Sequence, residues 1–121
     1  MGDKVLVVDD DTVFSQMVQY WLSKNGIETD LCENGGMACD MIQENKYRFI
    51  LIDYFLPALK GDEVCQSVRE HPASKNTPII MMTAFTDYKK EYFLERGATE
   101  GLFKPVSYED LMDVANKYPG E

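Results

Sequence analysis

Residues 49–53 read Phe49-Ile50-Leu51-Ile52-Asp53, four consecutive apolar residues that end on a carboxylate. A continuous apolar run is typical of a strand that is covered on both faces, as strands inside parallel sheets are. The same pattern occurs earlier in Val5-Leu6-Val7-Val8 and later in Ile79-Ile80-Met81-Met82. Weaker apolar segments at 27–32 and 102–103 bring the number of predicted strands to five.

Helical patterns lie between these strands. The first contains Phe14, Met17, Val18, Trp21 and Leu22 at helical spacing and stops near Asn25-Gly26. The same reasoning predicts further helices around residues 37–42, 64–68, 88–93 (ending at Gly97) and 107–115, the last with Ser107 as N-cap and Asp110 three residues on. The alternation predicts an α/β fold, a doubly wound five-stranded parallel sheet with right-handed crossovers.

Length and composition limit the classes of protein. With 121 residues, 45% of them hydrophobic, the chain is expected to form a single domain over residues 1–121. A net charge of −9 disfavours direct nucleic-acid binding. No apolar stretch reaches the roughly 18 residues of a membrane span, and the first residues do not resemble a signal peptide. We therefore expect a soluble cytoplasmic protein that does not bind a membrane; three cysteines without C-x-x-C spacing indicate no zinc site.

Polar residues follow the predicted strands, where doubly wound sheets bind ligands. They are Asp9-Asp10-Asp11 after the first strand, Asp53 after the third, Thr83 after the fourth and Lys104-Pro105 after the fifth. Converging carboxylates repel one another, so a hard divalent cation is expected among them, and Mg²⁺ fits best. A lysine and a hydroxyl suit phosphoryl oxygens, and an aspartate between them is a plausible nucleophile for phosphoryl transfer.

These motifs, together with Leu56-Pro57, Gly61, Met82-Thr83-Ala84 and Gly97-Ala98, resemble the receiver domains of two-component response regulators over nearly the whole chain. The resemblance implies a flavodoxin-like strand order 2-1-3-4-5. It also implies a signalling domain of a phosphorelay, which assists its own phosphorylation and dephosphorylation, instead of an ordinary enzyme.

The resemblance assigns roles to the acidic residues. Asp53 would be the phosphoacceptor. Asp10, Asp53 and the backbone carbonyl of Phe55 would ligate Mg²⁺ directly, and Asp9 would act largely through bound water. The phosphoryl donor would be a histidine kinase or a His-phosphotransfer protein.

Other roles follow from the same resemblance. Thr83, followed by Ala84, and Lys104 would hold the phosphoryl oxygens and take part in switching, and Pro105 would follow a cis peptide bond. An output partner or effector domain would dock on the face made by the fourth helix, the fifth strand and the fifth helix. A homodimer that forms on phosphorylation is a further expectation for that face.

The chain departs from the family pattern at Gly101, Phe55 and Phe85, among other positions. Gly101 stands where the family usually carries an aromatic residue that moves together with the threonine, so this coupling cannot operate in its ordinary form. Phe103, two residues on, would point to the same sheet face and is an alternative for that role. Phe55 and Phe85 are bulky where many relatives have small or polar residues, so we expect slow loss of the phosphoryl group because water is excluded.

Other functions remain open at this point. Asp9-x-Asp11-x-Val13 fits the opening motif of haloacid-dehalogenase-like phosphatases with Asp9 as nucleophile, but this alternative leaves Asp53 unexplained. A flavin carrier would need a phosphate-binding loop where the three aspartates stand. A degenerate receiver that acts only as a binding module, and aspartates that merely cap the first helix, are the remaining alternatives.

Overall fold

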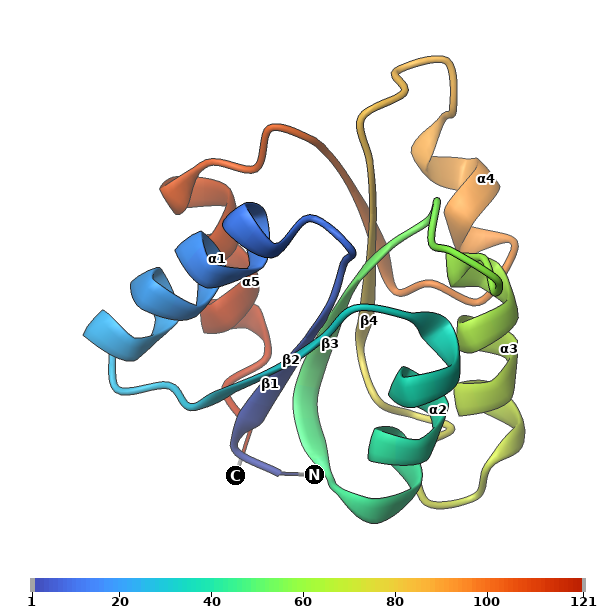
Figure 1. Ribbon diagram of the computed structural model, residues 1–121, viewed down its shortest axis with the longest axis horizontal. Coiled ribbons are helices and arrows are strands. Elements are labelled where there is room, and N and C mark those ends of the chain that lie inside the picture. Colours follow the sequence, from blue (N-terminus) through green and yellow to red (C-terminus); the bar gives the residue numbers. More distant parts are fainter. Residues whose placement is uncertain (1, 121) are drawn as a thin grey trace.

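The computed structural model describes residues 2–120, and Met1 and Glu121, the ends of the predicted domain, lie outside the described residues. Within residues 2–120, five strands alternate with five helices (Figure 1). The elements in chain order are β1 (Lys4–Val8), α1 (Thr12–Lys24), β2 (Thr29–Cys32), α2 (Gly35–Glu44), β3 (Tyr47–Asp53), α3 (Gly61–Glu70), β4 (Ile79–Thr83), α4 (Lys90–Leu94), β5 (Glu100–Phe103) and α5 (Tyr108–Lys117).

All strand pairs are parallel, and their order in the sheet is β2-β1-β3-β4-β5. Helices α1 and α5 cover one face of the sheet, and α2, α3 and α4 cover the other (Figure 1). This arrangement confirms the predicted doubly wound α/β fold and the order 2-1-3-4-5. No helix within residues 2–120 has both the length and the apolar character needed to cross a bilayer.

Two apolar clusters, one on each face of the sheet, form the core. Alternate residues of β3 enter opposite clusters: Ile50 and Ile52 pack under α2 and α3, whereas Phe49 and Leu51 pack under α1 and α5. All four side chains are at most 1% exposed. The run is therefore continuous in sequence because both faces of the strand are covered.

Local signals set the ends of α1 and α5. The Asp11 carboxylate accepts hydrogen bonds from the backbone N–H groups of Val13 and Phe14, and so caps α1. Helix α5 begins with the predicted capping box: Ser107 Oγ accepts from the N–H of Asp110, whose carboxylate accepts from the N–H of Ser107.

Helix α4 is shorter than predicted. Tyr88 was expected inside it, but the helix begins at Lys90, and Tyr88 lies in a bend before it. The Tyr88 ring packs against the rings of Tyr54 and Phe93, with centroids 5.5 and 6.0 Å away. The spacing of Tyr88 and Tyr92 thus reflects packing against common neighbours, and this packing does not require that both belong to one helix.

Candidate functional site

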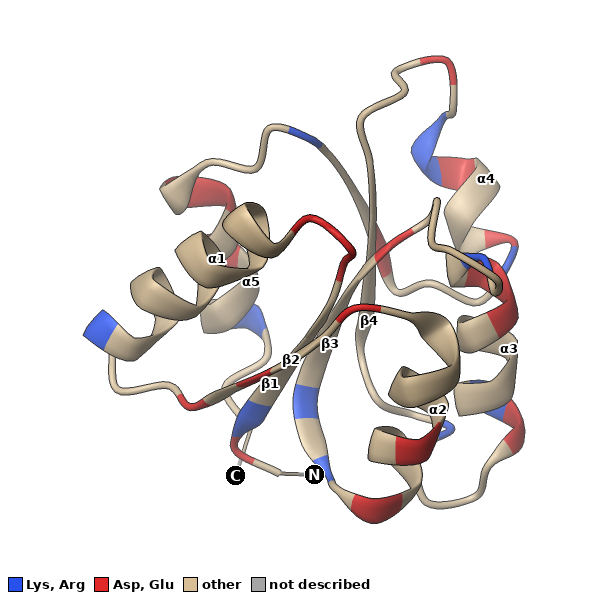
Figure 2. Ribbon diagram, viewed as in Figure 1, with Lys and Arg blue, Asp and Glu red and all other residues tan. Residues whose placement is uncertain are grey.

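The carboxyl ends of β1 and β3 bring the predicted acidic residues together. Val8 pairs in register with Ile52, so Asp9 and Asp53 leave neighbouring strands at the same edge. One carboxylate oxygen each from Asp9, Asp10 and Asp53 lies within 4.8 Å of the others. Figure 2 shows acidic segments after β1 and at the end of β3 that meet at this edge.

Lys104 reaches this acidic group from the other side of β4. Its backbone N–H donates to the carbonyl of Thr83 at 2.8 Å, which holds the chain after β5 against the end of β4. Its ammonium donates to Asp9 Oδ2 at 2.5 Å and to Asp53 Oδ2 at 3.0 Å. The Lys104–Pro105 peptide bond is cis. One cation therefore bridges two carboxylates of the group.

The protonation of this group follows from burial and hydrogen bonding. Burial raises the pKa of Asp9 above its usual value, although hydrogen bonds from Lys104 and from the N–H of Asp11 oppose the shift. Burial alone would lower the pKa of Lys104, but its hydrogen bonds to Asp9 and Asp53 outweigh this, and the pKa of Lys104 is raised. Lys104 is therefore a stable ammonium at neutral pH.

Backbone N–H groups orient three of the functional side chains by the same local turn. Asp9 Oδ1 accepts from the N–H of Asp11 at 2.9 Å, and Asp53 Oδ1 accepts from the N–H of Phe55 at 3.0 Å. Thr83 Oγ1 accepts from the N–H of Phe85 at 3.1 Å. Each turn begins where a strand ends, and the Thr83 hydroxyl keeps its own proton for an anionic oxygen.

The three consecutive aspartates have different surroundings. Asp11 caps α1 and lies outside the acidic group. The helix-capping alternative therefore applies to this one aspartate of the three. Asp9 is buried, and Asp10 is exposed. The group therefore has a buried side formed by Asp9 and an open side formed by Asp10, with the half-buried Asp53 between them in exposure.

Two phenylalanine rings lie next to the phosphoacceptor candidate. Phe55 is 36% exposed and Phe85 is 55% exposed, and their ring centroids are 5.0 Å apart. Ala84, between Thr83 and Phe85, is exposed in the bend after β4. The backbone N–H groups of both phenylalanines bind the side chains of Asp53 and Thr83, so both residues border the site.

Sequence reasoning missed Phe14. This residue was expected only as part of the apolar stripe of α1, but its ring centroid lies 4.5 Å from the ammonium of Lys104. An ammonium over an aromatic face is attracted by the ring quadrupole. No sequence signal joins these residues, because the contact depends on how α1 packs beside the end of β5.

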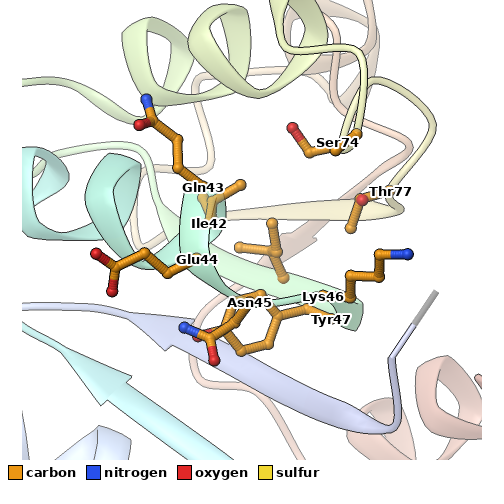
Figure 3. A pocket seen from close by; sticks show the side chains of 10 residues that line it. Ile42, Gln43, Glu44, Asn45, Lys46, Tyr47, Ser74 and Thr77 are labelled. Carbon is orange, nitrogen blue, oxygen red and sulfur yellow. The ribbon is translucent and has the colours of Figure 1, made fainter.

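A cavity of about 180 Å³ lies elsewhere in the fold. Figure 3 shows its lining by the end of α2, the start of β3 and the loop before β4, including Glu44, Tyr47 and Thr77. The amino ends of parallel strands lie opposite their carboxyl ends, so this cavity is at the other edge of the sheet from Asp53. The acidic group and Lys104 do not line it.

The donor set at the carboxyl edge suits a hard divalent cation. Three carboxylates offer oxygen ligands, and a lysine balances only part of their charge. Mg²⁺ is bound in proteins by one or two carboxylates together with waters and phosphate oxygens, and the exposure of Asp10 leaves room for such ligands. The residues present therefore fit a Mg²⁺ site.

Known proteins are similar to this chain in sequence and in fold. Residues 5–116 match the family described as response regulator receiver domain. The transcriptional regulatory protein SrrA of Staphylococcus aureus is 33% identical over 113 residues, which cover 93% of this chain and 46% of SrrA. The chain thus spans about half the length of the curated relatives that it matches.

Solved structures of response regulators and receiver domains have the same fold. Chemotaxis response regulator CheY4 of Vibrio cholerae is 32% identical, with a TM-score of 0.87 over 98% of this chain and 99% of that chain. The receiver domain of sensor histidine kinase PA1611 from Pseudomonas aeruginosa, solved with a magnesium ion in its active site cleft, is 25% identical, with a TM-score of 0.88 and 98% coverage of both chains. The chain belongs to the response regulator receiver domain family of two-component systems.

Proposed function

We propose that this receiver domain accepts a phosphoryl group on Asp53, with Mg²⁺ bound beside it. The observation that carries the proposal is the position of Asp53: its carboxylate lies within 4.8 Å of those of Asp9 and Asp10 and 3.0 Å from the ammonium of Lys104. A nucleophilic carboxylate between a cation site and a lysine is the arrangement that phosphoryl transfer needs, since that reaction depends mainly on positioning and charge neutralisation.

Exposure and hydrogen bonding favour Asp53 over Asp9 as the nucleophile. The side chain of Asp9 is 0% exposed, and its two oxygens bind the N–H of Asp11 and the ammonium of Lys104. The side chain of Asp53 is 14% exposed, so a phosphoryl donor can reach it. The phosphatase alternative, which uses Asp9 and leaves Asp53 without a role, is therefore not favoured.

The reaction transfers the phosphoryl group from a histidine kinase or a His-phosphotransfer protein. An oxygen of Asp53 bonds to phosphorus while the phosphorus–nitrogen bond of the donor breaks, and the imidazole keeps the electron pair and takes up a proton. Lys104 and the Thr83 hydroxyl, with the exposed backbone at Ala84, stabilise the phosphoryl oxygens.

Mg²⁺ would be held by Asp10, Asp53 and the Phe55 backbone carbonyl, with Asp9 acting through water, and would neutralise charge on the phosphoryl oxygens. The magnesium ion in the active site cleft of the PA1611 receiver domain supports this assignment, because the two chains share the fold over nearly their whole length.

The domain signals by changing its surface after phosphorylation. Phosphorylation shifts an equilibrium between two conformations, and an output partner or effector domain reads the face made by α4, β5 and α5. A homodimer through that face on phosphorylation is part of the proposal.

The lifetime of the phosphorylated state is expected to be long. The rings of Phe55 and Phe85 border the site and touch each other. Water must approach Asp53 past these rings to hydrolyse the acyl phosphate, and apolar side chains there exclude it.

Intact mass after incubation with acetyl phosphate tests the phosphoacceptor directly. The natural chain should gain one phosphoryl group only with Mg²⁺, and Asp53→Ala should gain none. Asp11→Asn is a matched control with a neighbouring charge removed, and it should still be labelled. A natural chain that gains nothing would favour a degenerate receiver, and label on Asp9 would favour the phosphatase alternative.

A further inference from the structure

Gly101 of β5 lies tightly against α4. The residue is buried, and a Cβ built on it would lie 3.2 Å from Cδ2 of Phe93 and 3.5 Å from Cγ of Lys90. Both neighbours belong to α4. An aromatic side chain at this position would therefore have to displace Phe93, so the space beside β5 is already filled from the helix.

Phe93 is the most enclosed residue of α4. It is 0% exposed, and its ring centroid lies 5.4 Å from that of Tyr54 and 5.5 Å from that of Tyr92. It also stacks against Tyr88. The large ring of Phe93 on α4 thus packs against a glycine on β5. The helix supplies the side-chain volume at this contact, and the strand supplies none.

The ring of Phe93 belongs to an aromatic cluster that reaches the phosphorylation site. The cluster comprises Tyr54, Phe55, Phe85, Tyr88, Tyr92 and Phe93, which touch with centroid separations between 4.8 and 6.0 Å. Its members come from the loop after β3, the loop after β4 and α4. One set of packed rings therefore joins both loops of the site to the helix.

Direct bonds attach this cluster to the reacting group. The N–H of Phe55 donates to Asp53 Oδ1, and the N–H of Phe85 donates to Thr83 Oγ1. At the other end, the hydroxyls of Tyr54 and Tyr92 are 2.7 Å apart and share a hydrogen bond. Any shift of Asp53 or Thr83 thus acts on backbone that carries a ring of the cluster.

We infer that the aromatic cluster couples phosphorylation of Asp53 to α4, with Phe93 in the place of the aromatic residue that β5 lacks. This inference rests on the proposed function, because it concerns what the phosphoryl group on Asp53 does. The new charge and volume at Asp53 change its bond to Phe55, and close-packed rings transmit the displacement instead of absorbing it.

Helix α4 is suited to move with the aromatic cluster. It spans only Lys90–Leu94, and its N-cap Lys89 makes no side-chain capping bond. A short helix without such a cap is held mainly by the packing of its buried ring. A movement of the cluster therefore displaces α4.

A reciprocal exchange tests whether Phe93 and residue 101 compete for one space. Gly101→Tyr, Phe93→Ala and the double variant are compared by urea denaturation. Each single change should lower the midpoint, and the double variant should lose clearly less than the two losses combined, since the new tyrosine occupies the space of the missing phenylalanine. If the loss in the double variant equals the sum of the two single losses, Phe93 and residue 101 do not compete for one space.

The switching role needs a readout other than stability. Backbone amide chemical shifts of residues 88–94 are followed by NMR on addition of acetyl phosphate and Mg²⁺, while intact mass reports phosphorylation. Phe93→Leu should become phosphorylated but lose most of the α4 shift. Phe49→Leu, a change of an equally buried phenylalanine on the opposite face of the sheet, should keep it.

The outcomes separate this inference from the proposed function. A natural chain that gains no phosphoryl group overturns the proposed function and the coupling with it. A Phe93→Leu variant that is phosphorylated and keeps the full α4 shift overturns the coupling alone. Phosphorylation without the α4 shift in Phe93→Leu, together with an unaffected Phe49→Leu, supports it.

Discussion

The ammonium of Lys104 lies 3.0 Å from Asp53 Oδ2, although 51 residues separate them in the chain. The same nitrogen binds Asp9, so the lysine that follows β5 links the residue after β1 to the last residue of β3. This bridge partly neutralises an acidic group, and the remaining negative charge is what a divalent cation would offset.

Mg²⁺ should stabilise the protein through Asp10. At a concentration about 100 times its dissociation constant, a ligand of the folded state adds about 2.7 kcal/mol to the free energy of unfolding. Thermal unfolding should therefore shift upward with Mg²⁺ and return with a chelator, and Asp10→Asn should lose most of the shift. Asp11→Asn should keep it, because asparagine still caps α1 and position 11 lies outside the acidic group. Equal losses in both variants would contradict the site.

Lys104→Met should destabilise the Mg²⁺-free protein. Removing one partner of a largely buried ion pair leaves uncompensated charge and costs about 3 kcal/mol. Urea denaturation should show this loss, and Mg²⁺ should restore more stability to the variant than it adds to the natural chain, because the cation replaces the missing charge. Lys89→Met, which changes an exposed lysine, is the control. A Lys104→Met variant as stable as this control would show that the bridge contributes nothing.

Phe14 should assist Lys104. Its ring lies 4.5 Å from the ammonium, and such a contact is worth about 1 kcal/mol. Phe14→Leu keeps an apolar side chain but removes the ring, so phosphorylation by acetyl phosphate should slow by roughly five-fold. Phe14→Tyr keeps the aromatic face and should react at nearly the natural rate. The rate is measured as the gain of mass with time, and identical rates in both variants would exclude a role for the ring.

Phe85→Ala should shorten the life of the phosphorylated state. Opening the space beside Asp53 admits water, and an acceleration on the order of ten-fold corresponds to about 1.4 kcal/mol of barrier. After acetyl phosphate is removed, the decay of phosphorylated mass gives the rate, and Phe55→Asn should act in the same direction. Tyr20→Ala, at an exposed aromatic of α1, should leave it unchanged. If neither Phe85→Ala nor Phe55→Asn loses the phosphoryl group faster than the natural chain, the two rings do not exclude water from Asp53.

Much of the fold was predictable from local patterns. The continuous apolar run at 49–52 predicted a strand covered on both faces, and the structure confirms it. The ends of α1 and α5 were predictable because Asn25-Gly26 and Ser107 act on their own neighbouring backbone. Helix α4 was less predictable, since tertiary packing and not helical continuity fixes Tyr88.

The sequence by itself determined which residues gather at the site, because the carboxyl ends of parallel strands meet at one edge of the sheet. Asp9, Asp10, Asp53 and Lys104 were predicted on this basis, and the structure places them together. The sequence marks each strand end by a change from apolar to polar residues. Each residue of the site can therefore be found from the sequence around its own strand.

Only the tertiary structure decided what surrounds these residues. It divided the three aspartates between the site and the cap of α1, brought Phe14 against Lys104 and placed Phe93 in the space beside Gly101. The last two contacts join different elements: Phe14 lies on α1 and Lys104 follows β5, and Phe93 lies on α4 whereas Gly101 lies on β5. They depend on the relative placement of helices on the sheet, and local sequence carries no record of that placement because packing is a property of both partners.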